Sequence, residues 1–309
     1  MSISSVMVSL DGSRFAEAAL AIAARLARSA GARLKIVMAH EPVMALVPAA
    51  DIPVTTGPDE VAMRAEQQSY LAGVVHDLGM IGNHPAEFAL VEGLAGPALV
   101  DQIERSAPDL VVMATHGRGP LSRLWLGSVA DHVIRHASVP LLLVRPKDGD
   151  PVPMADLKLA TVLVPLDRSP EAEAMLGPLT DLARLTQAHI TLLHVIEPVL
   201  GVSGAVPPYP VAVPQEALET LRVEGQKYLD QMADKLRADG LRVATKVVVG
   251  LGIAPTILAQ AEEGHTDFVA MSTHGAGGFR RLLLGSVADK VIRGSGKPVL
   301  VYRPPADRA

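Results

Sequence analysis

The stretch THGRGPLSRLWLGSVADHVIR, from Thr115 to Arg135, occurs twice in this chain. It returns as THGAGGFRRLLLGSVADKVIR, from Thr273 to Arg293. Aligned without gaps, residues 114–146 and 272–304 are identical at 19 of 33 positions. Identity at this level exceeds what a shared fold alone preserves, so we infer an internal duplication.

The beginnings of the two halves also match, which sets the length of the repeat. VSLDGSRFAEAAL from Val8 corresponds to VPLDRSPEAEAML from Val164. One domain of roughly 150 residues is therefore present twice. We predict a first domain at residues 1–146, a polar, turn-rich linker at 147–156 and a second domain at 157–309.

Each copy alternates between strand and helix patterns. Helices are expected to begin at or next to Ser13, Glu60, Pro97 and Ser128 in the first copy and at Ser169, Gln215, Pro255 and Ser286 in the second. Apolar runs predict strands at 6–10, 34–39, 87–91, 110–113 and 141–144, and at 162–166, 190–195, 242–249, 268–271 and 299–302. The predicted fold class is therefore α/β, with two tandem doubly wound domains, each a five-stranded parallel sheet with helices on both faces.

Composition narrows the classes of partner and chemistry. The 309 residues are 49% hydrophobic with a net charge of −5, so we expect neither nucleic acid nor a membrane as a partner. The chain has no cysteine, which excludes disulfides and thiolate chemistry. Its first residues lack a secretion-signal pattern, and we expect a cytoplasmic protein.

The repeated stretch carries features that suit phosphate. In parallel α/β sheets ligands bind beyond the carboxyl ends of the strands. Gly117 and Gly275 follow the fourth strand of each copy, where glycine allows positive φ and a close approach of the backbone to a ligand. After nine further residues, Gly127-Ser128 and Gly285-Ser286 begin a helix, whose free N–H groups attract anions.

A second reading of the serines stays open. Ser128 and Ser286 also fit helix N-caps, with Asp131 and Asp289 completing capping boxes of the S-x-x-D type. Capping explains the serines, but it leaves the paired glycines unexplained.

These residues resemble the universal stress protein family in its tandem two-domain form. The resemblance rests on LDGS at residues 10–13, on ATHGRGPLSRLWLGSVADHVIRHASVPLLLV at 114–144 and on the second copies of both. It covers nearly the whole chain and implies ATP lying along the strand ends. Other family members have lost the nucleotide.

The resemblance implies one nucleotide site in each copy. The first comprises Ser9, Asp11, Ala39, Ala114, His116, Gly117, Arg118, Gly119, Gly127, Ser128 and Val129. The second comprises Pro165, Asp167, Val195, Ser272, His274, Gly275, Ala276, Gly277, Gly285, Ser286 and Val287.

Within these sites the resemblance also implies individual roles. Asp11 and Asp167 face the ribose or a phosphate-bound Mg²⁺, although an aspartate in this position is often only a turn former. Ala39 and Val195 lie beside the adenine.

The sequence departs from the family pattern at two places. Ala114 and Ser272 replace the first glycine of the pattern. Pro120 stiffens the first loop where the second has Gly278, so we expect the second site to bind more readily.

Motifs of efficient phosphoryl transfer are missing, because residues 115–131 contain no lysine and no Walker A sequence occurs. We expect a nucleotide-responsive regulator of stress adaptation, with at most slow ATP hydrolysis. The alternatives are a weak ATPase and a nucleotide-free interaction protein acting through the proline-rich apolar loops at 41–58 and 197–215. We also expect the copies to associate through their last strands as a pseudo-dimer, with a homodimer of the whole chain left open.

Overall fold

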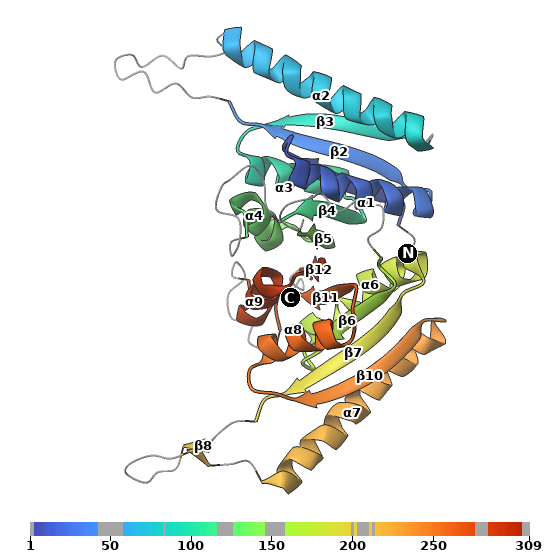
Figure 1. The fold of residues 1–309 in the computed structure, drawn as a ribbon, viewed down its shortest axis with the longest axis vertical. Coiled ribbons are helices and arrows are strands. Elements are labelled where there is room, and N and C mark those ends of the chain that lie inside the picture. Colours follow the sequence, from blue (N-terminus) through green and yellow to red (C-terminus); the bar gives the residue numbers. More distant parts are fainter. Residues whose placement is uncertain are drawn as a thin grey trace. The chain divides into compact units, whose positions relative to one another are not determined.

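The computed structural model describes residues 3–42, 58–82, 85–115, 126–145, 158–198, 201–202, 210–211, 214–275 and 284–304. The chain divides into two compact units, Met1–Leu157 and Lys158–Ala309 (Figure 1). The linker predicted at 147–156 lies outside the described residues.

The first unit is a parallel sheet covered by helices on both faces. Its strand order is β5-β4-β1-β2-β3, with every described pair parallel. Helix α1 packs against β1 and β4 and α2 packs against β3, whereas α3 and α4 pack together (Figure 1). The elements are β1 (Ser5–Leu10), α1 (Arg14–Ala30), β2 (Arg33–His40), α2 (Pro58–Gly82), β3 (Ala86–Glu92), α3 (Ala95–Ser106), β4 (Leu110–Ala114), α4 (Ser128–His136) and β5 (Leu141–Val144).

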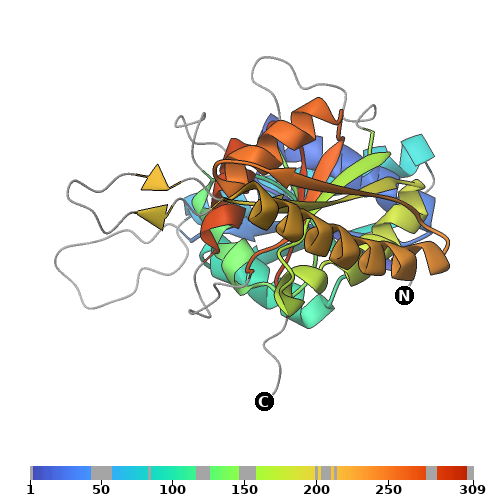
Figure 2. The same cartoon turned by 90° about the horizontal axis from the view of Figure 1, so that it is seen from below.

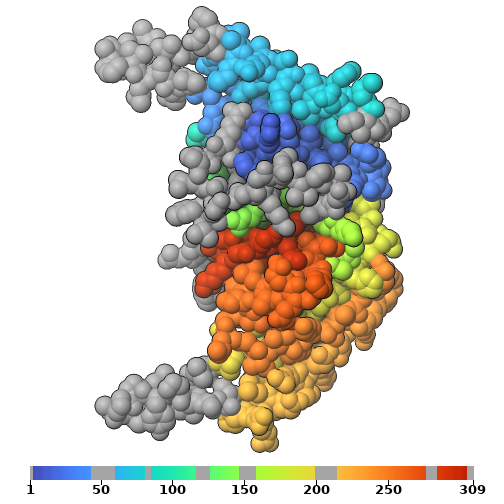
Figure 3. All heavy atoms as spheres, in the orientation of Figure 1, coloured from blue at the N-terminus to red at the C-terminus, as the bar shows by residue number. Residues whose placement is uncertain are grey.

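The second unit repeats this arrangement, with the order β12-β11-β6-β7-β10. Helices α7 and α8 lie on the two sides of β10 in Figure 2, and α8 and α9 lie side by side on the surface in Figure 3. The predicted fold class is confirmed. The elements are β6 (Thr161–Pro165), α5 (Pro170–Glu173), α6 (Leu176–Thr186), β7 (His189–Ile196), β8 (Gly201–Val202), β9 (Pro210–Val211), α7 (Gln215–Ala238), β10 (Arg242–Val249), α8 (Ile253–Glu263), β11 (Phe268–Ser272), α9 (Ser286–Gly294) and β12 (Val299–Tyr302).

The second unit has two features that the sequence patterns did not predict. The helix after Ser169 is divided into α5 and α6, whereas α1 is continuous. Pro178 explains the interruption, because it lacks the N–H that would bond to the carbonyl of Ala174 and its ring clashes with that carbonyl. The short strands β8 and β9 pair antiparallel within the predicted loop at 197–215.

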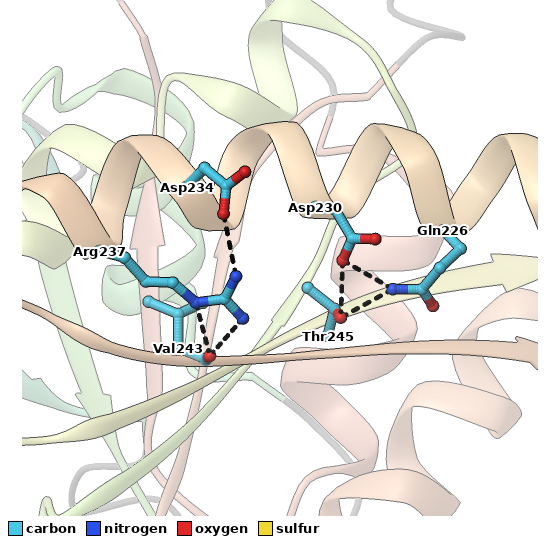
Figure 4. Close-up of polar contacts among 6 residues, drawn as sticks. All are labelled: Gln226, Asp230, Asp234, Arg237, Val243 and Thr245. Carbon is cyan, nitrogen blue, oxygen red and sulfur yellow. Dashed lines mark hydrogen bonds and ion pairs between the residues drawn. The ribbon is translucent and has the colours of Figure 1, made fainter.

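The outer edges of the two sheets differ in polarity. In the second unit Gln226 and Asp230 on α7 form hydrogen bonds of 2.8 and 3.1 Å to Thr245 on β10 (Figure 4). Arg237 donates to the carbonyl oxygen of Val243 with its Nη2 atom at 2.8 Å, so side chains of α7 cover this strand (Figure 4). Such coverage blunts an exposed sheet edge.

The first unit carries apolar residues at the corresponding places. By strand register Phe88 stands where Thr245 does, and its side chain is 40% exposed. On α2, Ala72 and Gly79 replace Asp230 and Arg237.

None of the described helices, including these long outer ones, has the length and apolar character needed to cross a membrane.

An aspartate at the start of β4 fastens the beginning of β1. Asp109 Oδ2 accepts hydrogen bonds from the backbone N–H groups of Ser4 and Ser5, at 2.8 and 2.9 Å, and from both serine hydroxyls. Burial raises the pKa of Asp109, but these hydrogen bonds outweigh it and the net pKa is lowered. Asp267 makes the same backbone contacts to Ala160 and Thr161 in the second unit.

We predict that Asp109→Asn lowers the urea midpoint at pH 7. A carboxylate whose pKa is depressed by folding stabilises the protein above its unfolded pKa of about 3.9. This contribution disappears as pH falls through the folded pKa, so the difference between the variant and the wild type should shrink as the pH is lowered below about 3.9. Asp101→Asn, at an exposed site on α3, is the matched control. A difference that stays constant with pH would contradict this account.

Candidate functional site

A backbone hydrogen bond in each unit joins the end of a strand to the start of a helix. The N–H of Gly127 donates to the carbonyl oxygen of Thr115 at 2.9 Å, and Gly285 makes the same 2.9 Å bond to Thr273. Because β1 and β4 are parallel neighbours, the residues after β1 lie at the same edge of the sheet, the one formed by the carboxyl ends of its strands, as the start of α4. Each unit thus brings Asp11 or Asp167 to the edge where α4 or α9 begins.

The starts of α4 and α9 have no side-chain cap. Their N-cap residues are Gly127 and Gly285, neither of which can supply a side-chain hydrogen bond. Ser128 and Ser286 are the first helical residues and are exposed. The alternative reading of these serines as N-caps is therefore wrong.

The aspartates assigned to capping boxes have another partner. Asp131 accepts hydrogen bonds of 2.8 and 2.9 Å from Arg135, one helical turn later. Asp289 accepts one of 2.8 Å from Arg293. At the start of each helix N–H groups and a serine hydroxyl therefore stay available to an anion.

Asp11 and Asp167 both form the turn that leads from the sheet into the next helix. The N–H of Ser13 donates to Asp11 Oδ1 at 2.9 Å, and the N–H of Ser169 donates to Asp167 Oδ1 at 3.0 Å. The turn-forming role considered from sequence is thus present. It uses Oδ1 of each carboxylate, and Oδ2 is the other oxygen.

In the second unit that other oxygen faces Gly275. A Cβ built on Gly275 would lie 2.2 Å from Asp167 Oδ2, which is closer than any side chain tolerates. Gly275 does not have a positive φ, so the conformational reason expected from sequence is wrong. Glycine is needed here because the aspartate approaches the loop backbone closely.

The residues implied to lie beside adenine have polar neighbours that were not predicted. Ala39 pairs with Val91 and is followed by buried His40, and Val195 follows His194. His194 Nδ1 is 2.8 Å from the carbonyl oxygen of Leu166 and so donates to it. The sequence signal that could have revealed these polar neighbours is a histidine within an apolar strand pattern, as at His40 and His194.

Around His194 the second unit gathers further polar groups. The Tyr228 ring meets His194 edge-on, and its hydroxyl donates to Glu173 at 2.9 Å. Burial, followed by this hydrogen bond, raises the pKa of Tyr228. The Arg168 guanidinium lies 6.0 Å from the same ring and 3.5 Å from Glu224.

Arg168 also has an unusual backbone. Its φ is 71°, whereas the corresponding residue of the first unit is Gly12, with φ 76°. A side chain at positive φ costs about 1–3 kcal/mol and persists where its surroundings fix it. The turn after β6 is therefore strained at Arg168, and it carries a guanidinium where the first unit has glycine.

In the first unit a buried polar cluster lies under the start of α2. His40 is fully buried, with Nδ1 2.7 Å from Gln67 Oε1 and Nε2 3.6 Å from Glu60 Oε1. Ile196 and Gly225 replace His40 and Gln67 in the second unit. The clusters of the two units thus differ in position and in composition.

The other predicted residues fall into three groups. Ser9 and Pro165 lie on β1 and β6, and Val129 and Val287 follow the first residues of α4 and α9. Ser272 turns its hydroxyl to the carbonyl oxygen of Tyr302 at 3.1 Å, Ala114 ends β4, and His274 Nδ1 is 2.9 Å from the Thr273 hydroxyl. His116, Gly117, Arg118, Gly119, Ala276 and Gly277 lie outside the described residues.

Among the described residues, Asp11 and Asp167 are the carboxylates that the family resemblance assigns to a phosphate-bound Mg²⁺. Within the described ranges no three histidine or carboxylate side chains gather in a way that would hold an ion. One carboxylate together with ligand phosphates is a usual environment for Mg²⁺. The residues thus fit an ion that arrives with a nucleotide.

We predict that Gly275→Ala destabilises the protein by about 1 kcal/mol, because the new methyl group pushes Asp167 out of its turn. In the Asp167→Ala background the same change should cost much less. Urea unfolding of the two single variants and the double variant measures this coupling. Purely additive effects would show that the contact with Asp167 does not explain the glycine.

The comparisons with known proteins agree with this architecture. The sequence profile of the universal stress protein family matches residues 3–145 and 159–303. A universal stress protein of Mycolicibacterium smegmatis is 29% identical over 308 residues, which cover 97% of this chain and 97% of the relative. One from Mycobacterium tuberculosis is 27% identical over 322 residues, covering 98% and 96%.

The solved structures show the same fold. The crystal structure of a universal stress protein from Archaeoglobus fulgidus has a TM-score of 0.68 at 19% identity and covers 97% of this chain and 98% of its own. Together with the family match over both copies, these observations establish that the chain belongs to the universal stress protein family, with two copies of the domain in tandem.

Proposed function

We propose that this chain is a cytoplasmic, ATP-binding regulator of stress adaptation that holds nucleotide at the carboxyl edge of each sheet. One observation carries the proposal. In both units a carboxylate after the first strand shares its edge with an uncapped helix start. Free N–H groups at a helix start bind phosphate, and the carboxylate accepts from ribose hydroxyls or contacts Mg²⁺.

The available groups favour binding over rapid turnover. Phosphoryl transfer requires cations that neutralise charge on the transferred group and a base that positions the nucleophile. The repeated stretch at 115–131 contains no lysine, so it lacks the cation that commonly neutralises the transferred phosphate. We therefore propose that ATP acts as a ligand that biases conformation or partner choice, with hydrolysis slow at most.

The test begins with the nucleotide that the purified chain carries. We expect denaturation to release about one or two equivalents of ATP, and the stripped protein to bind Mg-ATP in calorimetric titration. Gly127→Val and Gly285→Val place a side chain at the helix start of one unit each, so each should remove binding by that unit. At Gly285 a Cβ would already lie 3.0 Å from the carbonyl oxygen of Thr273.

Gly296→Val is the matched control, because nothing lies within 4 Å of a Cβ built there. Binding that survives both helix-start substitutions would contradict the proposed location. Absence of released nucleotide and of binding heat would refute the proposal. Function would then move to the apolar loops at 41–58 and 197–215, most of which lies outside the described residues. Rapid release of ADP from Mg-ATP would instead favour the ATPase alternative.

We also propose that the two copies associate through their apolar last strands, residues 141–144 and 299–302, as the family resemblance implies. An exposed apolar strand edge favours pairing with another strand. A fragment containing residues 157–309 alone should therefore dimerise or aggregate in analytical ultracentrifugation. A stable, soluble monomer would count against this association.

A further inference from the structure

We propose that His132 and His136, on the last turns of α4, form a binding site for a divalent transition-metal ion of the kind that imidazole favours, such as Cu²⁺, Ni²⁺ or Zn²⁺. This site is distinct from the proposed nucleotide edge, because the edge lies at Gly127 and Ser128, whereas His132 lies in the middle of α4 and His136 is its last residue. The inference therefore does not depend on nucleotide binding.

The spacing of the two rings supports the site. Residues four apart in a helix lie on one face, about 5–6 Å apart at Cβ. The ring centroids of His132 and His136 are 4.1 Å apart and their planes differ by 20°. The rings are stacked, so their in-plane lone pairs do not yet converge, and ligation of one ion requires side-chain rotations that bring one nitrogen of each ring to a common point.

The hydrogen bond of His136 prepares its ring for ligation. Nδ1 lies 2.7 Å from the main-chain carbonyl oxygen of His132, so Nδ1 carries the proton and donates it. The other ring nitrogen, Nε2, then has a free lone pair, and the side chain is exposed. Metal-binding histidines typically donate their second ring N–H to such an acceptor, which fixes the tautomer.

His132 is held in place by the neighbouring helix. A Cβ built on Gly96 of α3 would lie 2.9 Å from the Cβ and Cγ atoms of His132 and 3.0 Å from Cδ2. Only glycine at position 96 admits the ring this closely, so one edge of the imidazole rests on α3. A ring fixed in this way loses less freedom on binding an ion.

The charged neighbours on α4 form a pair of their own. Asp131 is bound to Arg135 by two hydrogen bonds and is not free to ligate. The two imidazoles would be the protein ligands, with water completing the coordination. Imidazole nitrogen favours Cu²⁺, Ni²⁺ and Zn²⁺ over Mg²⁺ or Ca²⁺.

The second unit provides an internal comparison. Helix α9 repeats the sequence of α4 closely, yet Lys290 and Gly294 stand where the histidines do. Neither position carries an imidazole, so α9 cannot form the equivalent site. The same substitutions, His132→Lys and His136→Gly, therefore convert α4 to a sequence that this fold already accommodates.

The experiment uses the full chain stripped of nucleotide and metals. Cu²⁺ titration followed by electron paramagnetic resonance should show one bound ion with two nitrogen ligands, and Zn²⁺ should raise the Tm because it binds the folded state. His136→Ala, His132→Lys and the double variant should lose this ion and the Tm shift. His189→Ala, at an exposed position on β7, should retain both.

The outcomes separate the proposal from its competitors. Equal Cu²⁺ binding by the wild type and the double variant would overturn it, as would a spectrum showing a single nitrogen ligand. If His132→Lys perturbs folding, His136→Ala decides alone, because that side chain is exposed and at the helix end. The nucleotide measurements are unaffected by either result, so the two proposals fail independently.

Discussion

The candidate site of each unit depends on one backbone hydrogen bond, from Gly127 to Thr115 and from Gly285 to Thr273. Thr115 is buried, and its own N–H donates to the carbonyl oxygen of Val144, so a single residue links two strands and a helix start. The intervening loops have different sequences, GRGPLSRLWL and GAGGFRRLLL. The bond keeps the helix start next to the strand end in both units despite that difference.

Much of the fold was predictable from sequence because its signals are local. The caps at Ser13 and Ser169, the proline after Ser169 and the apolar strand runs act within a few residues, and the structure has these elements where predicted. The S-x-x-D motif gave a wrong prediction. Asp131 could complete a capping box or pair with Arg135 four residues later, and in the structure it pairs with Arg135. A motif of four residues does not show which of these two interactions Asp131 makes.

The parts of the site that sequence reasoning missed are those set by long-range register. His194 meets Leu166 only because β6 and β7 pair in parallel, and Asp167 meets Gly275 only because a loop more than a hundred residues later returns to the same edge. The need for glycine at 275 was recognised, but it was assigned to positive φ and to the close approach of a ligand, whereas the close neighbour in the structure is Asp167. Distances between distant segments were required to identify the real cause.

Joining two copies in one chain removes a restriction that symmetry imposes on identical subunits. In a homodimer every substitution appears in both subunits, whereas here Arg168 of the second unit corresponds to Gly12 of the first and His194 corresponds to Met38. The hydrogen bond at each helix start is common to both units. Divergence of the two copies has therefore changed side chains around the proposed ligand position and kept the backbone contact that positions the helix start. Under the proposed function, two unequal nucleotide sites would fill over a wider range of ligand concentration than two identical ones, so one molecule would give a graded rather than a single-threshold response.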